Sequence, residues 1–238
     1  MLPENKKREV SINMAPDLWI YGNSYTGKTV FVNSFDNVLM LNTDGNVDHI
    51  NSPILRIKDQ ITQQGRLTIR KYAWLNFKEI VTELEKKENT YETIAVDLLE
   101  DLYEHCRVYM YDKLKIEHES DAQFGKGYDM VKTEFLSTLK RLKNIGYQVV
   151  FISKEVKQEL RKAGVPQTWF RPNLPEKIIN VIEGMVDITT RVTAEGTKRY
   201  LNFKASETTT GGGRYNFRVD KVELNKTAFL ELIKNTKI

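Results

Sequence analysis

The sequence predicts an α/β protein with a mainly parallel sheet, flanked by helices and extended by C-terminal antiparallel strands. Short apolar runs alternate with amphipathic stretches over the first two-thirds of the chain, as in strands joined by crossover helices. Hydrophobic residues make up 40% of the 238 residues and charged residues 29%, which is typical of a globular protein. Because no linker or repeat divides the chain, we expect one domain over residues 1–238, with its core at about 17–220.

The elements of this core follow in order along the chain. Each expected strand is a short apolar run, and each expected helix places apolar residues three or four positions apart. The strands are expected at 17–21, 38–41, 93–96 and 147–152, and the helices at 74–88, 99–116 and 128–144. Beyond residue 173 we expect a helix at 175–183, a β-hairpin of 186–193 and 198–203, a strand at 215–219 and a final helix at 226–235.

Composition and charge exclude several classes of protein. The net charge is only +4, so non-specific binding to a polyanion cannot be the whole function. A single cysteine, Cys106, excludes a disulfide framework and a cysteine-rich zinc site. No apolar run approaches the ~20 residues that a membrane span requires, and the charged start lacks the apolar segment of a secretory signal. We therefore expect a cytoplasmic protein with no membrane partner.

Residues 22–29 match the phosphate-binding pattern G-x-x-x-x-G-K-[ST] at every fixed position. The glycines let backbone N–H groups turn toward phosphate oxygens, and the loop precedes a helix start whose dipole favours negative charge. We expect Lys28 to reach the β- and γ-phosphates of a bound nucleotide, and the Thr29 hydroxyl to ligate Mg²⁺. The expected nucleotide-binding residues are Gly22, Asn23, Ser24, Tyr25, Thr26, Gly27, Lys28 and Thr29.

Acidic residues at the ends of other strands complete this expected site. Asp97 directly follows the strand at 93–96 and is the candidate Mg²⁺ ligand, although it could also cap the next helix. Glu100 and Asp101 are expected to face water. Asp44 is the candidate for orienting the attacking water, but an Asp-Gly turn explains it equally well. Lys154, just after the strand at 147–152, is either a γ-phosphate sensor or a solvated surface lysine.

At these residues the chain resembles the RecA-like P-loop ATPases. More narrowly, it is similar to the phage-encoded nucleotide-binding proteins of the Sak type, which are linked to single-strand annealing and recombination. The resemblance covers about residues 17–220 and implies a RecA-like P-loop NTPase core. The segments that carry it are Gly22–Thr29, Thr93–Asp97, Val149–Lys154, Leu174–Lys177 and Gly184–Asp187.

The resemblance also implies a function and an assembly. Such proteins hydrolyse ATP with Mg²⁺ and act on single-stranded DNA, which implies a homo-oligomeric ring or filament in the host cytoplasm and a single-strand-binding or recombinase protein as a further partner. Where RecA-like cores have an Asp-x-Glu pair, this chain has Asn42-Thr43-Asp44; where they have an Asn-Gln sensor, it has Ser153-Lys154. Arg214 stands where a basic residue faces the nucleotide of a neighbouring subunit, and a solvated loop arginine is the alternative.

Residues 154–171 form the expected DNA-binding loop. Five basic and two acidic side chains leave this segment with a charge of +3, close to that of the whole chain. Trp169 and Phe170 offer stacking faces for bases, or they anchor the loop to the domain. The resemblance implies that DNA-contacting loops leave the sheet here. The expected DNA-binding residues are Lys154, Lys157, Arg161, Lys162, Trp169 and Arg171.

Two other functions remain open from the sequence. A small-molecule kinase shares the phosphate loop and the α/β sheet, and residues 160–171 would then serve as its lid. A partner-binding module such as a helicase loader would use ATP to set its shape. The guanine signature Asn-Lys-x-Asp fails at Ala228, which argues against a GTPase.

Overall fold

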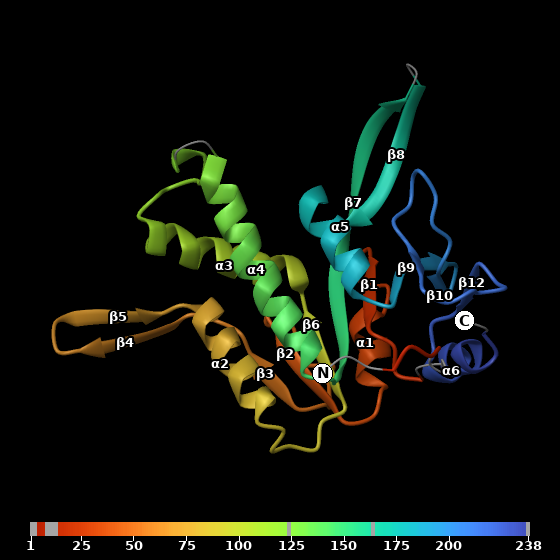
Figure 1. The fold of residues 1–238 in the computed structure, drawn as a ribbon, viewed down its shortest axis with the longest axis horizontal. Coiled ribbons are helices and arrows are strands. Elements are labelled where there is room, and N and C mark those ends of the chain that lie inside the picture. The colour runs from red at the N-terminus through yellow and green to blue at the C-terminus, as the bar shows by residue number, and fades with distance from the viewer. Residues whose placement is uncertain (1–3, 8–13, 123–124, 163–164, 237–238) are drawn as a thin grey trace.

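The structure is a computed structural model that describes residues 4–7, 14–122, 125–162 and 165–236. Its centre is a ten-stranded sheet with a parallel part in the order β9-β1-β7-β6-β2-β3 (Figure 1). The antiparallel strands β10 and β12 extend the sheet beside β9, and β11 also pairs with β9. The bounds are β1 Leu18–Gly22, β2 Val38–Asn42, β3 Ile54–Arg56, β6 Thr93–Asp97, β7 Gln148–Lys162, β9 Ile188–Glu195, β10 Lys198–Asn202, β11 Gly212–Gly213 and β12 Lys221–Glu223.

Helices cover both faces of this sheet. Side chains alternate along β1, so Trp19 packs into one core while Leu18 and Ile20 pack into the other. Helices α2, α3, α4 and α5 cover the Trp19 face, and α1 and α6 cover the opposite face. Their bounds are α1 Lys28–Asn33, α2 Ala73–Glu85, α3 Leu99–Leu114, α4 Lys126–Asn144, α5 Glu176–Met185 and α6 Lys226–Lys234. Within the described ranges, no helix is long and apolar enough to span a membrane.

The predicted α/β class, with a mainly parallel sheet and antiparallel C-terminal strands, is confirmed. The expected strand at 215–219 is wrong, because the outermost strand of this end is β12 instead. The alternating aromatic residues of that segment pack inward without forming a strand: Phe217 lies 4.6 Å from Phe203 and 5.8 Å from Tyr215 between ring centroids. The alternation of aromatic residues in this segment therefore indicates packing against the core. It does not indicate pairing with a neighbouring strand.

Two β-hairpins project from the body of the molecule (Figure 1). The expected loop at 154–171 is wrong, because β7 continues to Lys162 and pairs with β8 (Val165–Pro172); we call residues 155–172 the β7–β8 arm. Strands β4 (Gln60–Gln64) and β5 (Leu67–Lys71) form a hairpin that the sequence did not predict, the β4–β5 arm of residues 60–71. A projecting hairpin has no face on the core, so it lacks the alternation that marks a half-buried strand.

Candidate functional site

The phosphate loop joins the buried strand β1 to α1, which begins at Lys28. A Cβ at Gly22 would lie 2.6 Å from the carbonyl oxygen of Val192, so the neighbouring strand leaves room only for glycine. Gly27 has a φ of +86°, in the left-handed region that other residues rarely adopt. The backbone itself thus requires both fixed glycines of the motif.

The side chain of Lys28 folds back onto this loop. Its Nζ donates hydrogen bonds of 2.8 Å to the carbonyl oxygens of Gly22 and Asn23, and the residue is only 7% exposed. Burial lowers the pKa of Lys28, and the nearby Asp97 carboxylate acts in the opposite direction. The loop therefore holds its cation where the motif receives phosphate oxygens.

Thr29 and Asp97 come together as the sequence predicts. The Thr29 hydroxyl donates to Asp97 Oδ2 at 2.8 Å, and Asp97 is buried at the carboxyl end of β6. Burial raises the pKa of Asp97 to about 6, although the hydrogen bond from Thr29 lowers it. One hydroxyl and one carboxylate fit Mg²⁺, which takes its remaining ligands from water and phosphate in such sites.

Asp44 lies on the loop after β2. Its Oδ1 accepts hydrogen bonds from Asn42 Nδ2 at 3.0 Å and from the Asn46 N–H at 2.9 Å, and its Oδ2 accepts one from Asn46 Nδ2 at 2.7 Å. Burial acts to raise the pKa of Asp44, but these hydrogen bonds outweigh burial and hold the pKa below its ordinary value. Asp44 is thus a turn-forming aspartate, and its role toward water stays a prediction.

A cavity of about 410 Å³ adjoins the phosphate loop. Besides loop residues 24–30, three predicted residues line it: Asp97 of β6, Lys154 of β7 and Asp44 of the loop after β2. The sequence analysis missed Leu98, which directly follows Asp97. It also missed three lining residues in a stretch with no motif or periodicity. They are Asn46, His49 and Ile50. This stretch follows β2, and β2 pairs in parallel with β6, which ends at Asp97. Only that pairing could have indicated that the stretch reaches the site.

Lys154 lies where β7 leaves the sheet. Its side chain is exposed at the nucleotide cavity, while its N–H donates to Glu100 Oε1 at 2.7 Å. The expectation that Glu100 faces water is wrong, because the first turn of α3 packs beneath the end of β7 and leaves Glu100 only 9% exposed. Burial raises the pKa of Glu100 to about 7. Glu100 thus connects the helix after Asp97 to the base of the β7–β8 arm.

The expected DNA-binding residues lie on two different faces of the β7–β8 arm. Paired residues share a face, so the register places Lys157 and Arg161 on one face and Trp169 and Arg171 on the other. Lys157 and Arg161 are exposed, and Trp169 is half-buried. Lys162 is the last residue of β7. No single face of the arm therefore gathers the whole predicted set.

Arg171 holds the arm together. Its Nε donates to Gln158 Oε1 at 2.8 Å, and its Nη1 donates to the carbonyl oxygen of Leu174. The guanidinium carbon lies 5.3 Å from the centre of the Trp169 ring. Arg171 is thus already engaged in protein contacts, and Lys157 Nζ lies 5.8 Å from the centre of the Phe170 ring.

Phe170 anchors the arm to the domain, which is one of the two roles that the sequence analysis left open. Its N–H donates to the Thr208 carbonyl oxygen at 2.9 Å, and the Arg191 guanidinium carbon lies 3.8 Å from its ring centre. Arg191 Nε in turn donates to Glu155 Oε2 at 2.5 Å, and the Glu155 side chain is 1% exposed. A buried ion pair and an aromatic ring therefore fix the base of the arm.

Arg214 lies at the edge of the sheet opposite the phosphate loop. Its Nη2 donates to the Gly184 carbonyl oxygen at 2.8 Å, and its Nη1 is 3.6 Å from Asp187 Oδ1, just before β9. Because β9 and β1 are parallel, the starts of both strands share this edge, while the phosphate loop follows the end of β1. Any contact of Arg214 with nucleotide is therefore confined to the nucleotide of another copy.

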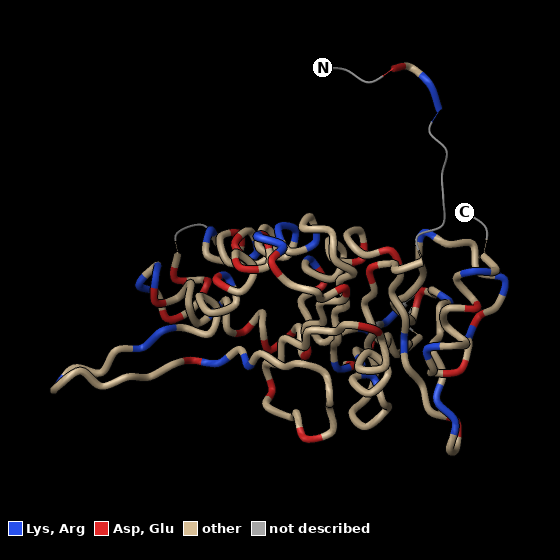
Figure 2. Tube along the Cα trace, turned by 90° about the horizontal axis from the view of Figure 1, so that it is seen from below, with Lys and Arg blue, Asp and Glu red and all other residues tan. Residues whose placement is uncertain are grey.

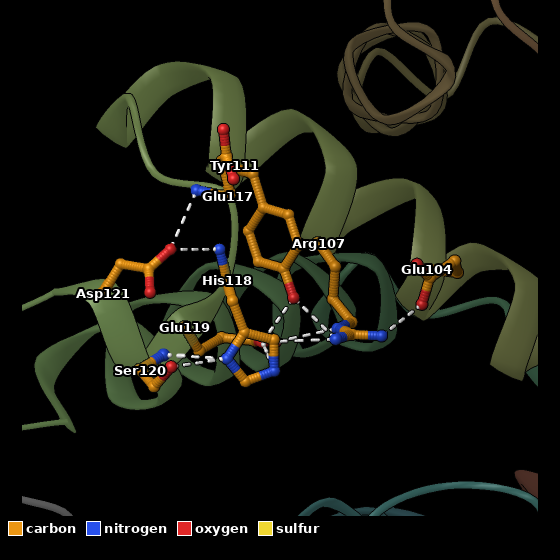
Figure 3. A network of polar contacts seen from close by, with 8 residues as sticks. All are labelled: Glu104, Arg107, Tyr111, Glu117, His118, Glu119, Ser120 and Asp121. Atoms are coloured by element: carbon orange, nitrogen blue, oxygen red, sulfur yellow. Dashed lines mark hydrogen bonds and ion pairs between the residues drawn. The ribbon is translucent and has the colours of Figure 1, made fainter.

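Residues 117–122 contain a short 3₁₀ helix, Glu119–Asp121, which is held against α3 (Figure 3). Glu119 is buried and accepts hydrogen bonds from Arg107 Nε at 2.8 Å and from the Tyr111 hydroxyl. Burial acts to raise the pKa of Glu119, but these two donors outweigh it and lower the pKa to about 2. A locked carboxylate of this kind is poorly suited to contact DNA.

This network also lines a second cavity, of about 660 Å³, between α3, α4 and the start of α5. Its acidic lining residues are Glu100, Asp101, Glu104, Glu119 and Asp129. These carboxylates outnumber the lining cations, which are Arg107, Lys132 and Lys177, and the phosphate loop does not line this cavity. The cavity beside the phosphate loop is therefore the candidate nucleotide site.

One comparison with known proteins, a match to a family model, agrees with this geometry. A family model described as AAA domain (AAA_24) matches residues 14–215, which include the phosphate loop, Asp97 and the β7–β8 arm. No curated protein matches the chain. Among solved structures, the fold is similar to a prototypical ATPase from the type III secretion system of pathogenic bacteria, with 11% identity and a TM-score of 0.41; the match covers 75% of this chain and 52% of that ATPase, so the chain spans about half of its length. The chain belongs to the AAA domain family of P-loop NTPases.

Proposed function

We propose that this ATPase acts on single-stranded DNA in phage recombination or replication, as an annealing protein or recombination mediator of the Sak type. The observation that carries the proposal is the continuity of β7. This strand contributes Lys154 to the nucleotide cavity and then continues as the β7–β8 arm, which presents exposed cations and a half-buried tryptophan. One rigid strand thus connects the place of hydrolysis to a surface suited to nucleic acid.

The chemistry of the arm fits a single strand without sequence preference. Lys157 and Arg161 can follow a phosphate backbone, and Trp169 on the other face offers a stacking surface that accepts any base. A strand that crosses the edge of this narrow hairpin can meet both faces. Lys154 at the base of β7 adds an exposed cation, and Lys162 is the last residue of the strand, near the tip of the arm.

At the nucleotide, each residue has a separate task. Lys28 would donate to phosphate oxygens in place of its two carbonyl partners, and Thr29 and Asp97 would hold the metal. Bound Mg²⁺ supplies charge neutralisation at the phosphates. Asp44, with its carboxylate fixed by Asn42 and Asn46, orients the attacking water.

The base of β7 couples the nucleotide site to the β7–β8 arm. Lys154 faces the cavity, and its backbone is held by Glu100 from the helix that follows Asp97. A change in phosphate state at Lys154 therefore acts on the strand that continues into the arm. In a ring or filament, Arg214 of one copy would face the nucleotide of the next.

The kinase alternative receives less support. It needs residues 160–171 as a lid over the nucleotide, but the described residues that line the nucleotide cavity include none from the β7–β8 arm. The arm projects away from the body (Figure 1). No observation favours a helicase loader over a protein that contacts DNA itself.

Phosphate release tests the proposal directly. The protein is assayed with ATP and Mg²⁺, with and without single-stranded DNA, and in parallel with nucleosides as phosphate acceptors. We expect turnover that single-stranded DNA increases, and that Lys28→Ala abolishes. DNA-independent turnover with phosphate transfer to an acceptor would instead establish the kinase.

A further inference from the structure

The β4–β5 arm takes no part in the nucleotide site. Every residue from Gln60 to Arg70 is exposed, including Ile61 at 67%, Leu67 at 70% and Ile69 at 43%. Within the described chain, β4 and β5 pair only with each other. A two-stranded hairpin is at best marginally stable in water, whereas three or more strands with an apolar face can be stable. The arm is therefore incomplete as a folded unit.

The root of this arm is nevertheless fixed. Asp59 Oδ1 accepts the Ala73 N–H at 2.8 Å, and its Oδ2 accepts Arg70 Nε at 2.6 Å. The Arg70 guanidinium lies over the Tyr72 ring at 4.6 Å, and that ring contacts Tyr109 of α3 edge-on. These contacts hold the arm out from the body in one direction (Figures 1 and 2).

The arm lacks the chemistry of a nucleic-acid contact. No aromatic side chain occurs between Gln60 and Lys71. Arg70 is paired with Asp59, and Lys71 Nζ lies 2.5 Å from Glu79 Oε2. In the described part of the chain, Arg66 at the tip is the cation of the arm without an acidic partner. The exposed surface is thus mainly apolar and amide, which suits a protein.

The free edge of β4 is open to another strand. Its sequence, Gln-Ile-Thr-Gln-Gln, has no charge and no proline, the residues that commonly protect an edge strand, whereas β5 carries Arg70 and Lys71. Hydrogen-bonded and non-hydrogen-bonded pairs alternate from the two-residue turn, so the backbone N–H and C=O groups of Ile61 and Gln63 point away from β5.

We propose that this edge docks a second copy of the chain, with β4 antiparallel to β4 of the second copy about a two-fold axis at Thr62. Ile61 of each copy exchanges backbone hydrogen bonds with Gln63 of the other, roughly four bonds in all. The product is a four-stranded sheet in which Ile69 and Thr62 of both copies form one row across a face.

Antiparallel pairing of the two uncharged β4 edges also keeps the cations of the two arms apart. The cations of each arm lie at its root, on β5, so antiparallel pairing places them at opposite ends of the four-stranded sheet. Lys71 of one copy then shares a row with Leu67 of the other. The arrangement brings no like charges together, and it converts two marginal hairpins into a sheet of stable size.

Disulfide trapping tests this geometry. Thr62 faces its counterpart as a non-hydrogen-bonded pair, with Cα atoms about 4.5 Å apart, within the range of a disulfide. The single native cysteine, Cys106, is fully buried, so Thr62→Cys introduces the accessible thiol. We expect Thr62→Cys to give a disulfide-linked dimer under mild oxidation, and the matched control Thr68→Cys on β5 to give none. Equal trapping of both variants, or of neither, overturns the proposal.

A second measurement does not depend on trapping. Gln63→Pro removes an outward N–H while leaving the pairing inside the hairpin intact, so we expect its dimer to dissociate about tenfold or more readily in sedimentation equilibrium. Far-ultraviolet circular dichroism and the melting temperature verify the fold. A wild-type protein that stays monomeric at all concentrations refutes the docking of a second copy, as does a Gln63→Pro variant that loses DNA affinity with its assembly unchanged.

Discussion

The β7–β8 arm and the β4–β5 arm have the same architecture but opposite surfaces and roots. The β7–β8 arm continues a central strand of the sheet and is fixed by the buried pair of Glu155 and Arg191. The β4–β5 arm follows the edge strand β3 and is fixed by the more exposed pair of Asp59 and Arg70. The first arm presents cations and aromatic rings, and the second presents aliphatic and amide side chains. Because both arms have the shape of a hairpin, we infer the partner of each arm from its surface chemistry.

The largest expected effect is on ATP turnover, and it should arise from a change at the nucleotide site without affecting the β4–β5 arm. Lys28→Ala should lower ATP turnover about a hundredfold or more, as expected for the loss of a charge that stabilises the transition state. The two carbonyl oxygens left without a donor should cost only about 1 kcal/mol in unfolding free energy. Phosphate release and sedimentation of the same preparation provide the measurement, with dimer formation unchanged. Wild-type turnover in this variant would refute the assignment of the site.

The next prediction compares the two roots. Arg191→Leu leaves the buried Glu155 carboxylate without a partner, so the unfolding free energy should fall by about 3 kcal/mol. The matched change Arg70→Leu breaks a pair whose side chains are 46% and 26% exposed, and should cost less than about 1 kcal/mol. Urea unfolding of both variants measures the difference. Equal costs would contradict the view that the two arms differ in how firmly they are rooted.

A smaller effect should distinguish the surfaces of the two arms. Trp169→Ala should weaken binding to single-stranded DNA about tenfold, because base stacking contributes roughly 1–3 kcal/mol per base. Ile69→Ala, on the β4–β5 arm, should leave that affinity unchanged. Fluorescence anisotropy with a labelled oligonucleotide measures both. If Trp169→Ala lowers the melting temperature and keeps full affinity, the tryptophan serves packing, and the face with Lys157 and Arg161 becomes the binding surface to test.

The smallest expected effect concerns salt. Replacing Arg161 and Lys162 by glutamine should reduce the slope of log affinity against log salt by up to about 0.7 per lost phosphate contact. Arg66→Gln, at the tip of the other arm, is the matched control and should leave the slope unchanged. Titrations between low and moderate salt provide both slopes. If Arg66→Gln alone reduced the slope, the β4–β5 arm would be the DNA-binding arm, and the account would be contradicted.

The sequence predicted those parts of the molecule that face the core or carry a motif. The phosphate loop was predictable because each fixed position has a backbone or charge requirement, and Asp97 because it ends a buried strand. His49 and Ile50 were not, since they reach the site only through the pairing of β2 with β6. Glu100 was misjudged because helical position alone does not reveal that β7 covers the first turn of α3.

The sequence pattern predicted neither arm as a β-hairpin. Residues 154–171 were correctly located at the exit from the sheet, but a hairpin exposed on both faces shows no alternation, so a loop was predicted. The division of Lys157 and Trp169 between opposite faces follows from the register with β8. That register depends on pairing between strands, which no local sequence pattern specified.

The contrast between the arms can be tested in a single measurement. Photo-crosslinking of the wild-type protein to single-stranded DNA, followed by peptide mapping, reports on both arms at once. The account predicts adducts on peptides that contain residues 155–172, concentrated at Trp169, and none on peptides that contain residues 60–71. Adducts on residues 60–71 with none on residues 155–172 would contradict it.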